Sequence, residues 1–197
     1  MRNRQAGYSL VEILSVVAII GTLSVIAMPA FFNLRKQQAV NAATSEIRGI
    51  LHRVRSRAIA RGSNSAVKFV VLGGTWHYAI YDDGDGDGVR NADITSGVDR
   101  LVAPPQPVLH AIGFARIGIP VRGVKDVDSA TILHSTDSPV RFGVSTLCSF
   151  SSMGSGTPGS VFLTDGDERG TIVRVFGASG RIRVMRFNRG TNQWEDR

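Results

Sequence analysis

The stretch GYSLVEILSVVAIIGTLSVIAMPAFF, residues 7–32, decides how this chain is organised, because it is long and apolar enough to cross a lipid bilayer. About 20 helical residues cross the roughly 30 Å hydrocarbon core of a membrane. The stretch carries a single charged residue, Glu12, near its start. A carboxylate inside a membrane costs about 2.5–3.5 kcal/mol on insertion scales, so its presence there indicates a function.

The residues before this stretch indicate its orientation. Residues 1–7, MRNRQAG, contain two arginines and no acid, which predicts a cytoplasmic N-terminus and a single pass through a bacterial inner membrane, with the rest of the chain in the periplasm. A secretory signal peptide would have a shorter apolar core followed by a small-x-small cleavage site. A plain signal anchor fits the length but leaves Glu12 unexplained.

Glu12 requires a cation, and a free α-amino group is a good candidate. Cleavage just before Tyr8 would create one, and residues four apart share a helix face, so Tyr8 and Glu12 are close neighbours. The amine could belong to the same chain or to an adjacent subunit of a filament, and packing decides between the two.

The motif GYSLVE after a short basic leader resembles the processing signal of type IV pilins and type II secretion pseudopilins. The resemblance implies that a prepilin peptidase cleaves after Gly7 and N-methylates Tyr8. It also implies that Glu12 serves assembly with other pilins or pseudopilins. The chain departs from the family at Tyr8, where phenylalanine or methionine is usual.

Beyond the bilayer-crossing stretch, the helical pattern continues. Apolar residues recur every three or four positions from Leu34 to Ala58, and arginines occupy the other face, which predicts an amphipathic helix over 33–62 that ends at Gly62. Together the two parts predict one helix of about 55 residues. Pro29 removes one backbone hydrogen bond and is expected to kink it. The apolar stripe requires a partner sheet.

After Gly62 the pattern becomes that of β-strands. Residues 66–72 and 75–81 alternate around a Gly-Gly pair, which predicts a hairpin. A long loop is expected over 82–100, and three prolines at 104, 105 and 107 are expected to break regular structure. Further strands are expected at 130–134 and 140–147, followed by a meander of 160–164, 170–176 and 181–187.

These elements predict an α+β, pilin-like fold, with a long N-terminal helix packed on a mostly antiparallel sheet. The glycine-rich segment near residue 155 and the following IVRVFGASGRIRV resemble the minor pseudopilins called GspH/FimT. The implied role is a structural subunit of a type II secretion pseudopilus or a type IV pilus. The alternative is a DNA-binding minor pilin for natural transformation. The expected parts are a leader (1–7), a transmembrane and assembly helix (8–32), an amphipathic helix (33–62) and a periplasmic β-rich domain (63–197).

The segment GRIRVMR, residues 180–186, carries the DNA alternative. On a strand, Arg181 and Arg183 share a face, whereas Arg186 is off that register but near enough to the strand end to join them. Arginines suit the phosphates of double-stranded DNA, and some FimT-like pilins carry a similar G-R-x-R element. The competing interpretation is an edge strand protected from aggregation by its charges.

An acidic segment at 83–93 resembles the first half of a D-x-D-x-D-G calcium loop. Its twelfth position is Ile94 instead of an acid, so the pattern is incomplete. The competing interpretation is a glycine-rich turn without a metal. The candidate calcium ligands are Asp83, Asp85, Asp87, Asn91 and Asp93.

The remaining composition restricts the function further. The net charge is +7 and the single cysteine, Cys148, has no partner for an internal disulfide, so we expect it to be buried. The segment GSGTPG (154–159) is followed by a strand pattern, which does not fit a phosphate-binding loop. The histidines show no metal-ligand spacing and no catalytic constellation is apparent. We therefore expect a structural protein that is not an enzyme and has no cofactor besides the candidate calcium.

Overall fold

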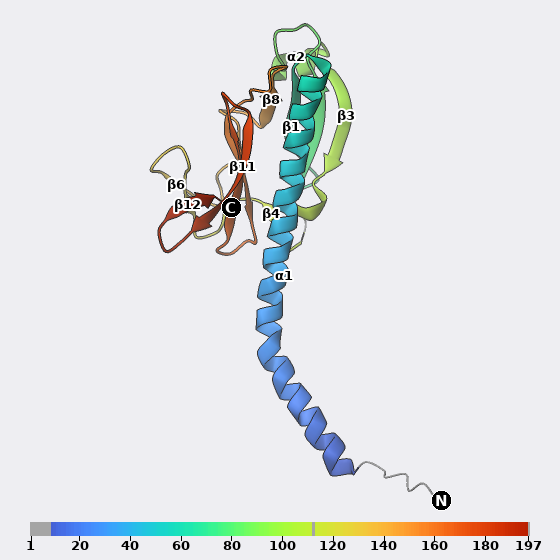
Figure 1. The fold of residues 1–197 in the computed structure, drawn as a ribbon, viewed down its shortest axis with the longest axis vertical. Helices are drawn as coiled ribbons and strands as arrows, with labels where there is room; N and C mark the ends of the chain where they lie inside the picture. The colour runs from blue at the N-terminus through green and yellow to red at the C-terminus, as the bar shows by residue number, and fades with distance from the viewer. Residues whose placement is uncertain (1–8, 112, 197) are drawn as a thin grey trace, which may run out of the picture.

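The computed structural model describes residues 9–111 and 113–196. Its main feature is α1 (Leu10–Arg61), a continuous helix of 52 residues, as the sequence predicts. Figure 1 shows that its N-terminal half extends away from the rest of the chain and bends. Pro29 lies inside α1 and provides a physical reason for a bend, because it cannot donate a backbone hydrogen bond.

The C-terminal half of α1 packs on the sheets through one stripe of side chains. The buried stripe begins at Val40. Leu34, which the sequence periodicity assigned to the stripe, is exposed. The helix ends where Gly62 adopts a left-handed conformation (φ 67°) and its N–H donates to the carbonyl of Ile59. The buried residues are Val40, Ala43, Thr44, Ile47, Ile50, Leu51, Val54 and Ala58.

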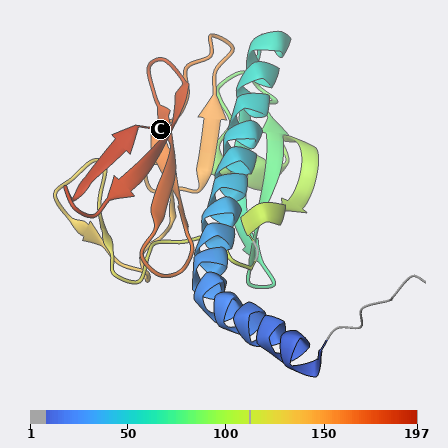
Figure 2. The same cartoon turned by 60° about the horizontal axis from the view of Figure 1, so that its bottom comes forward.

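Two antiparallel sheets receive this stripe, and Figure 2 shows α1 lying along the junction between them. The first has the order β3-β2-β1-β8 and contains the predicted hairpin. Its strands are β1 (Ser65–Leu72), β2 (Thr75–Asp82), β3 (Arg100–Pro107) and β8 (Leu147–Phe150).

The second sheet has the order β12-β11-β10-β9-β4 and contains the predicted C-terminal meander. Strand β7 also pairs with β9. Strand β12 was not expected from the sequence. The strands are β4 (Arg116–Ile117), β7 (Val140–Arg141), β9 (Gly159–Thr164), β10 (Gly170–Phe176), β11 (Arg181–Asn188) and β12 (Gln193–Asp196).

Three expectations for the middle of the chain differ from the structure. The prolines at 104, 105 and 107 lie inside β3, which tolerates them because β3 is an edge strand and its pairing with β2 shifts register near Ile80. The expected loop over 82–100 contains a short helix, α2 (Asn91–Ser96). Where longer strands were expected near 130 and 140, the structure has the short pair β5 (Val124–Lys125) and β6 (Ile132–Leu133), followed by β7 and β8. A short 3-10 helix, η1 (Leu109–Ala111), follows β3.

The main core lies between α1 and both sheets, and Cys148 is fully buried within it, as expected. A buried carboxylate fastens the end of α1 to this core. The Arg57 guanidinium donates to both oxygens of Asp82, at 2.8 and 2.7 Å, and the Ser65 hydroxyl donates to one of them at 2.7 Å. These bonds hold the pKa of Asp82 below its usual range, with the Arg57 hydrogen bond as the main cause.

Candidate functional site

The exposed half of α1 is the first candidate site. It is long and apolar enough to span a membrane, and the most apolar window of the helix is not buried in the structure. Glu12 lies in its first turn, where its backbone N–H donates to the carbonyl of Ser9 at 3.0 Å. Gly7 and Tyr8, the predicted cleavage and methylation residues, lie outside the described residues.

Several polar side chains in this half are satisfied by the helix itself. The hydroxyls of Ser15, Thr22 and Ser24 each donate to a carbonyl one turn earlier, at 2.8 Å. Such bonds make hydroxyls compatible with lipid. Among the described residues, by contrast, no side chain forms a hydrogen bond or ion pair with the carboxylate of Glu12.

The predicted arginine patch lies on the β10–β11 hairpin. Arg181 is opposite Phe176 in the ladder and Arg183 is opposite Arg174, so these four side chains share one face, as the sequence predicts for Arg181 and Arg183. The Phe176 ring lies beneath two guanidinium groups, with its centroid 5.4 Å from Cζ of Arg174 and 5.9 Å from Cζ of Arg183. Arg183 also forms an ion pair with Asp196.

The structure separates Arg186 from this patch. It is five residues from Arg181, so alternation places it on the opposite face of β11, and it lines a different cleft with Glu195. Arg48 of α1 is the arginine that joins Arg181 and Arg183, in a cleft of about 340 Å³. Sequence reasoning missed Arg48 because only the packing of α1 brings it to β11.

The acidic loop brings three of its predicted calcium ligands together. Carboxylate oxygens of Asp83, Asp85 and Asp87 lie within 4.8 Å of one another. Asp83 already accepts hydrogen bonds from Asn64 and from the backbone N–H groups of residues 85, 86 and 88. Burial raises the pKa of Asp83, but these bonds outweigh it and the pKa is lowered. Asp87 forms an ion pair with Arg90.

The other two predicted ligands lie in the first turn of α2. The Asn91 amide nitrogen donates to the Ser145 hydroxyl at 2.9 Å. Asp93 is outside that cluster, and its Oδ2 atom is buried with no hydrogen-bond partner in the described part of the chain. The structure thus brings together three of the four predicted aspartate ligands.

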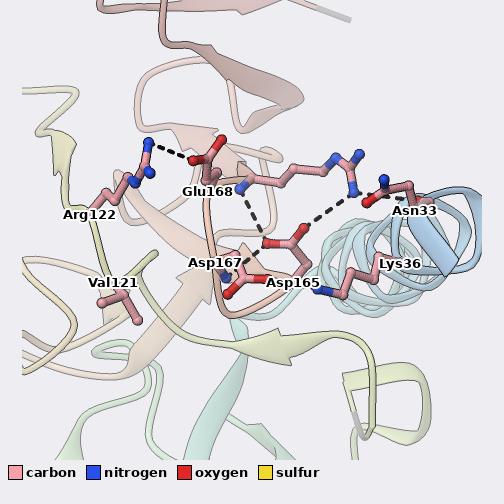
Figure 3. A pocket seen from close by; sticks show the side chains of 8 residues that line it. Asn33, Lys36, Val121, Arg122, Asp165, Asp167 and Glu168 are labelled. Atoms are coloured by element: carbon pink, nitrogen blue, oxygen red, sulfur yellow. Dashed lines mark hydrogen bonds and ion pairs between the residues drawn. The ribbon is translucent and has the colours of Figure 1, made fainter. Parts of the chain in front are cut away.

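A further cleft, of about 400 Å³, lies where α1 leaves the sheets (Figure 3). Lys36 donates to Asp167 at 2.7 Å, and this hydrogen bond raises the pKa of Lys36 and lowers that of Asp167. Arg169 lies within 3.4 Å of the Asn33 carbonyl and 3.3 Å of Asp165. Sequence reasoning missed this cleft, because Lys36 and Asp167 meet across 131 positions of the chain.

Comparison with known families bears on the N-terminal segment. Residues 2–28 match the model of the prokaryotic N-terminal methylation motif, and this range contains Gly7, Tyr8 and Glu12. No curated protein and no solved structure gives a significant match to the chain. The motif implies processing by a prepilin peptidase and assembly with other pilins, and the apolar half of α1 is consistent with membrane anchoring. The motif therefore supports a type IV pilin-like protein with a structural role.

Proposed function

We propose that the chain is a minor pilin or pseudopilin, a structural subunit of a type II secretion pseudopilus or a type IV pilus. One observation carries this proposal: residues 10–28 of the methylation motif lie in the half of α1 that stands clear of the domain. A helix half that none of the described residues cover is suited to two environments in turn, first a lipid bilayer and then the bundle of helices at the centre of a filament.

The proposed mechanism is assembly. The leader keeps the chain in the inner membrane, with the β-rich part in the periplasm, until a prepilin peptidase cleaves after Gly7 and methylates Tyr8. The apolar half of α1 then leaves the membrane, and contacts with other helices replace its contacts with lipid.

Glu12 has a defined role in this mechanism. Its charge is costly in lipid, and its carboxylate has no partner among the described residues. Pairing with the terminal amine of an adjacent subunit satisfies both groups at once. Because this pairing forms at only one axial offset between neighbouring helices, it sets the register of the subunit in the filament.

We assign the chain to the GspH/FimT type on its C-terminal half. The support is the resemblance of the segment that forms β9, β10 and β11, and the long helix packed on antiparallel sheets. A role as a minor subunit means that few copies enter each filament, so detection must be sensitive.

The experiment that tests this function is incorporation into filaments. A tagged chain is expressed in its host, surface filaments or overexpressed pseudopili are sheared off, and the tag is measured in the purified filaments. We expect the tag to copurify with them in the wild type and to be absent from the sheared fraction of a strain without the prepilin peptidase. A tag that stays entirely in the membrane fraction of both strains contradicts the proposal.

The alternative is a DNA-binding minor pilin. It is supported by the cleft in which Arg48 joins Arg181 and Arg183, and by Phe176 beneath two of the hairpin arginines. Arginines around an aromatic ring form a surface suited to a nucleic-acid backbone. The ion pair of Arg183 with Asp196 counts against it, because DNA would have to compete with that carboxylate.

A further inference from the structure

Contacts at the C-terminal end of the apolar run of α1 set the distance between the β-rich part of the chain and a membrane that α1 crosses. That run ends at Phe32, and Lys36 lies four residues later, about 6 Å further along the helix axis. The β9–β10 turn contacts α1 at this point, because Asp167 pairs with Lys36 and Arg169 reaches the Asn33 carbonyl. The turn is therefore held within about one helical turn of the end of the apolar run.

This distance matches the thickness of a headgroup layer. A bilayer of about 40–45 Å with a hydrocarbon core of about 30 Å leaves roughly 5–8 Å of headgroups on each side. When α1 crosses the membrane, Lys36 and the turn paired with it consequently lie within the headgroups.

A second turn reaches the same level. In the turn of residues 120–123, the N–H of Gly123 donates to the carbonyl of Pro120 at 2.8 Å, so Val121 and Arg122 occupy its corners. Val121 is 63% exposed although it is apolar, and it lines the cleft with Asn33 and Lys36. An exposed valine beside an arginine is suited to the boundary between headgroups and acyl chains.

The charges of the cleft suit a phospholipid headgroup. Figure 3 shows acidic side chains of the β9–β10 turn between α1 on one side and Arg122 on the other. Cationic groups attract the phosphate, and carboxylates attract the ammonium group of a zwitterionic lipid. The cations are Lys36, Arg122 and Arg169, and they pair with the carboxylates of Asp167, Glu168 and Asp165, so a headgroup must exchange with these pairs.

We infer that the 120–123 turn and the β9–β10 turn form a docking surface for the phospholipid headgroups of the membrane that α1 crosses. This inference rests on the membrane anchoring in the proposed function. Docking orients the domain on the membrane before extraction, and its headgroup contacts must break when the subunit enters a filament.

The test places a fluorescent label at the proposed surface and measures quenching by lipid. The full chain with Val121→Cys is labelled in nanodiscs of phosphatidylethanolamine and phosphatidylglycerol that contain a headgroup-attached quencher. Val144→Cys is the matched control, because Val144 is fully exposed and adjoins Ser145, which contacts α2 at the far end of the molecule (Figure 1). Burial raises the pKa of the Cys148 thiol, which protects it from labelling.

We expect quenching at position 121 to be several-fold stronger than at position 144. Equal quenching in nanodiscs that contain the protein overturns the docking surface and leaves membrane anchoring intact, whereas a chain that fails to enter nanodiscs overturns both. Hydrogen exchange of the unlabelled chain provides a second readout. Residues 120–123 and 165–169 should exchange more slowly in nanodiscs than in detergent, and unchanged exchange there contradicts the inference.

Discussion

The guanidinium of Arg57 donates to both carboxylate oxygens of Asp82, so the last turns of α1 are fastened to the end of β2 by a bidentate ion pair. The Asp82 carboxylate is buried, and Arg61 also lies 3.3 Å from it. This pair joins the helix to the sheet at the end opposite the Lys36–Asp167 contact. The helix is therefore held at both ends of its packed half.

Replacing Asp82 is expected to be costly. Asp82 is buried but Arg57 is 32% exposed, so the loss is that of charge-assisted hydrogen bonds, and Asp82→Asn should lower the free energy of unfolding by about 2 kcal/mol. Urea denaturation of the full chain in detergent measures it. Asp167→Asn is the matched control, since its pair with Lys36 is exposed and should change the free energy of unfolding little. Equal effects of the two substitutions would contradict the claim that the Arg57–Asp82 pair fastens α1 to the sheet.

The free energy of unfolding should depend on pH through the Arg57–Asp82 pair. Because Arg57 lowers the pKa of Asp82 in the folded protein, this carboxylate contributes stability above its unfolded pKa, and the contribution is lost as the pH falls through its lower folded pKa. The free-energy difference between the wild type and Asp82→Asn should therefore shrink in acid. A difference that grows as the pH falls would give the opposite sign and refute the assignment.

Glu12 provides the prediction specific to assembly. Glu12→Ala should insert into the membrane and be cleaved normally, because removing the charge makes insertion easier. Its incorporation into filaments should fall at least tenfold, measured as tag in the sheared fraction. Ser15→Ala is the control on the same helix half, since the Ser15 hydroxyl donates to the carbonyl of Val11 within α1 itself. If Glu12→Ala assembles as well as Ser15→Ala, the proposed pairing with a terminal amine is wrong.

The arginine cleft makes a prediction about double-stranded DNA. If the cleft binds phosphates, the full chain in nanodiscs should bind duplex DNA with little sequence preference and with an affinity that falls steeply with salt. Substituting Arg48 and Arg181 with glutamine should weaken binding and flatten the salt slope by roughly one unit per lost contact. Arg186→Gln is the matched control on the other face of β11.

Two results decide against the DNA alternative. Loss of binding in Arg186→Gln equal to that in the double variant would indicate general basic attraction. No binding even at low salt would remove the alternative and leave the assembly role. Arg57, although also a helix arginine, is unsuitable as a control because its substitution should disturb the fold.

Calcium binding is testable by thermal unfolding. If Asp83, Asp85 and Asp87 bind calcium, millimolar calcium should raise the melting temperature of the full chain in detergent and a chelator should reverse the effect, because a ligand of the folded state stabilises it by mass action. Asp85→Asn should reduce the shift, whereas Asp126→Asn, outside the loop, should not. A melting temperature that responds to neither calcium nor chelator would mean that the loop is only a hydrogen-bonded turn.

Local patterns predict the parts of this fold that depend on neighbouring residues. Short windows of sequence are enough to predict three features: the periodicity of α1, its end at Gly62, and the alternation of β1 and β2. The prolines of β3 led to a wrong prediction of irregular structure. A strand tolerates prolines when it lies at the edge of a sheet, and no local pattern shows that β3 does so.

The candidate sites divide in the same way. The face shared by Arg181 and Arg183 follows from strand alternation, as does the separation of Arg186. Arg48 joins them only because α1 packs against β11, and Lys36 meets Asp167 across 131 positions of sequence. Such contacts follow from tertiary packing, so they could not be predicted from the chain alone.

The most direct test of the account is the intact mass of the protein extracted from the membranes of its host. We predict a chain that has lost residues 1–7, begins at Tyr8 and carries one added methyl group, together with the full-length chain in a strain without the prepilin peptidase. A wild-type mass showing an uncleaved chain, or cleavage at any other position, would contradict the assignment of this protein as a pilin-like subunit.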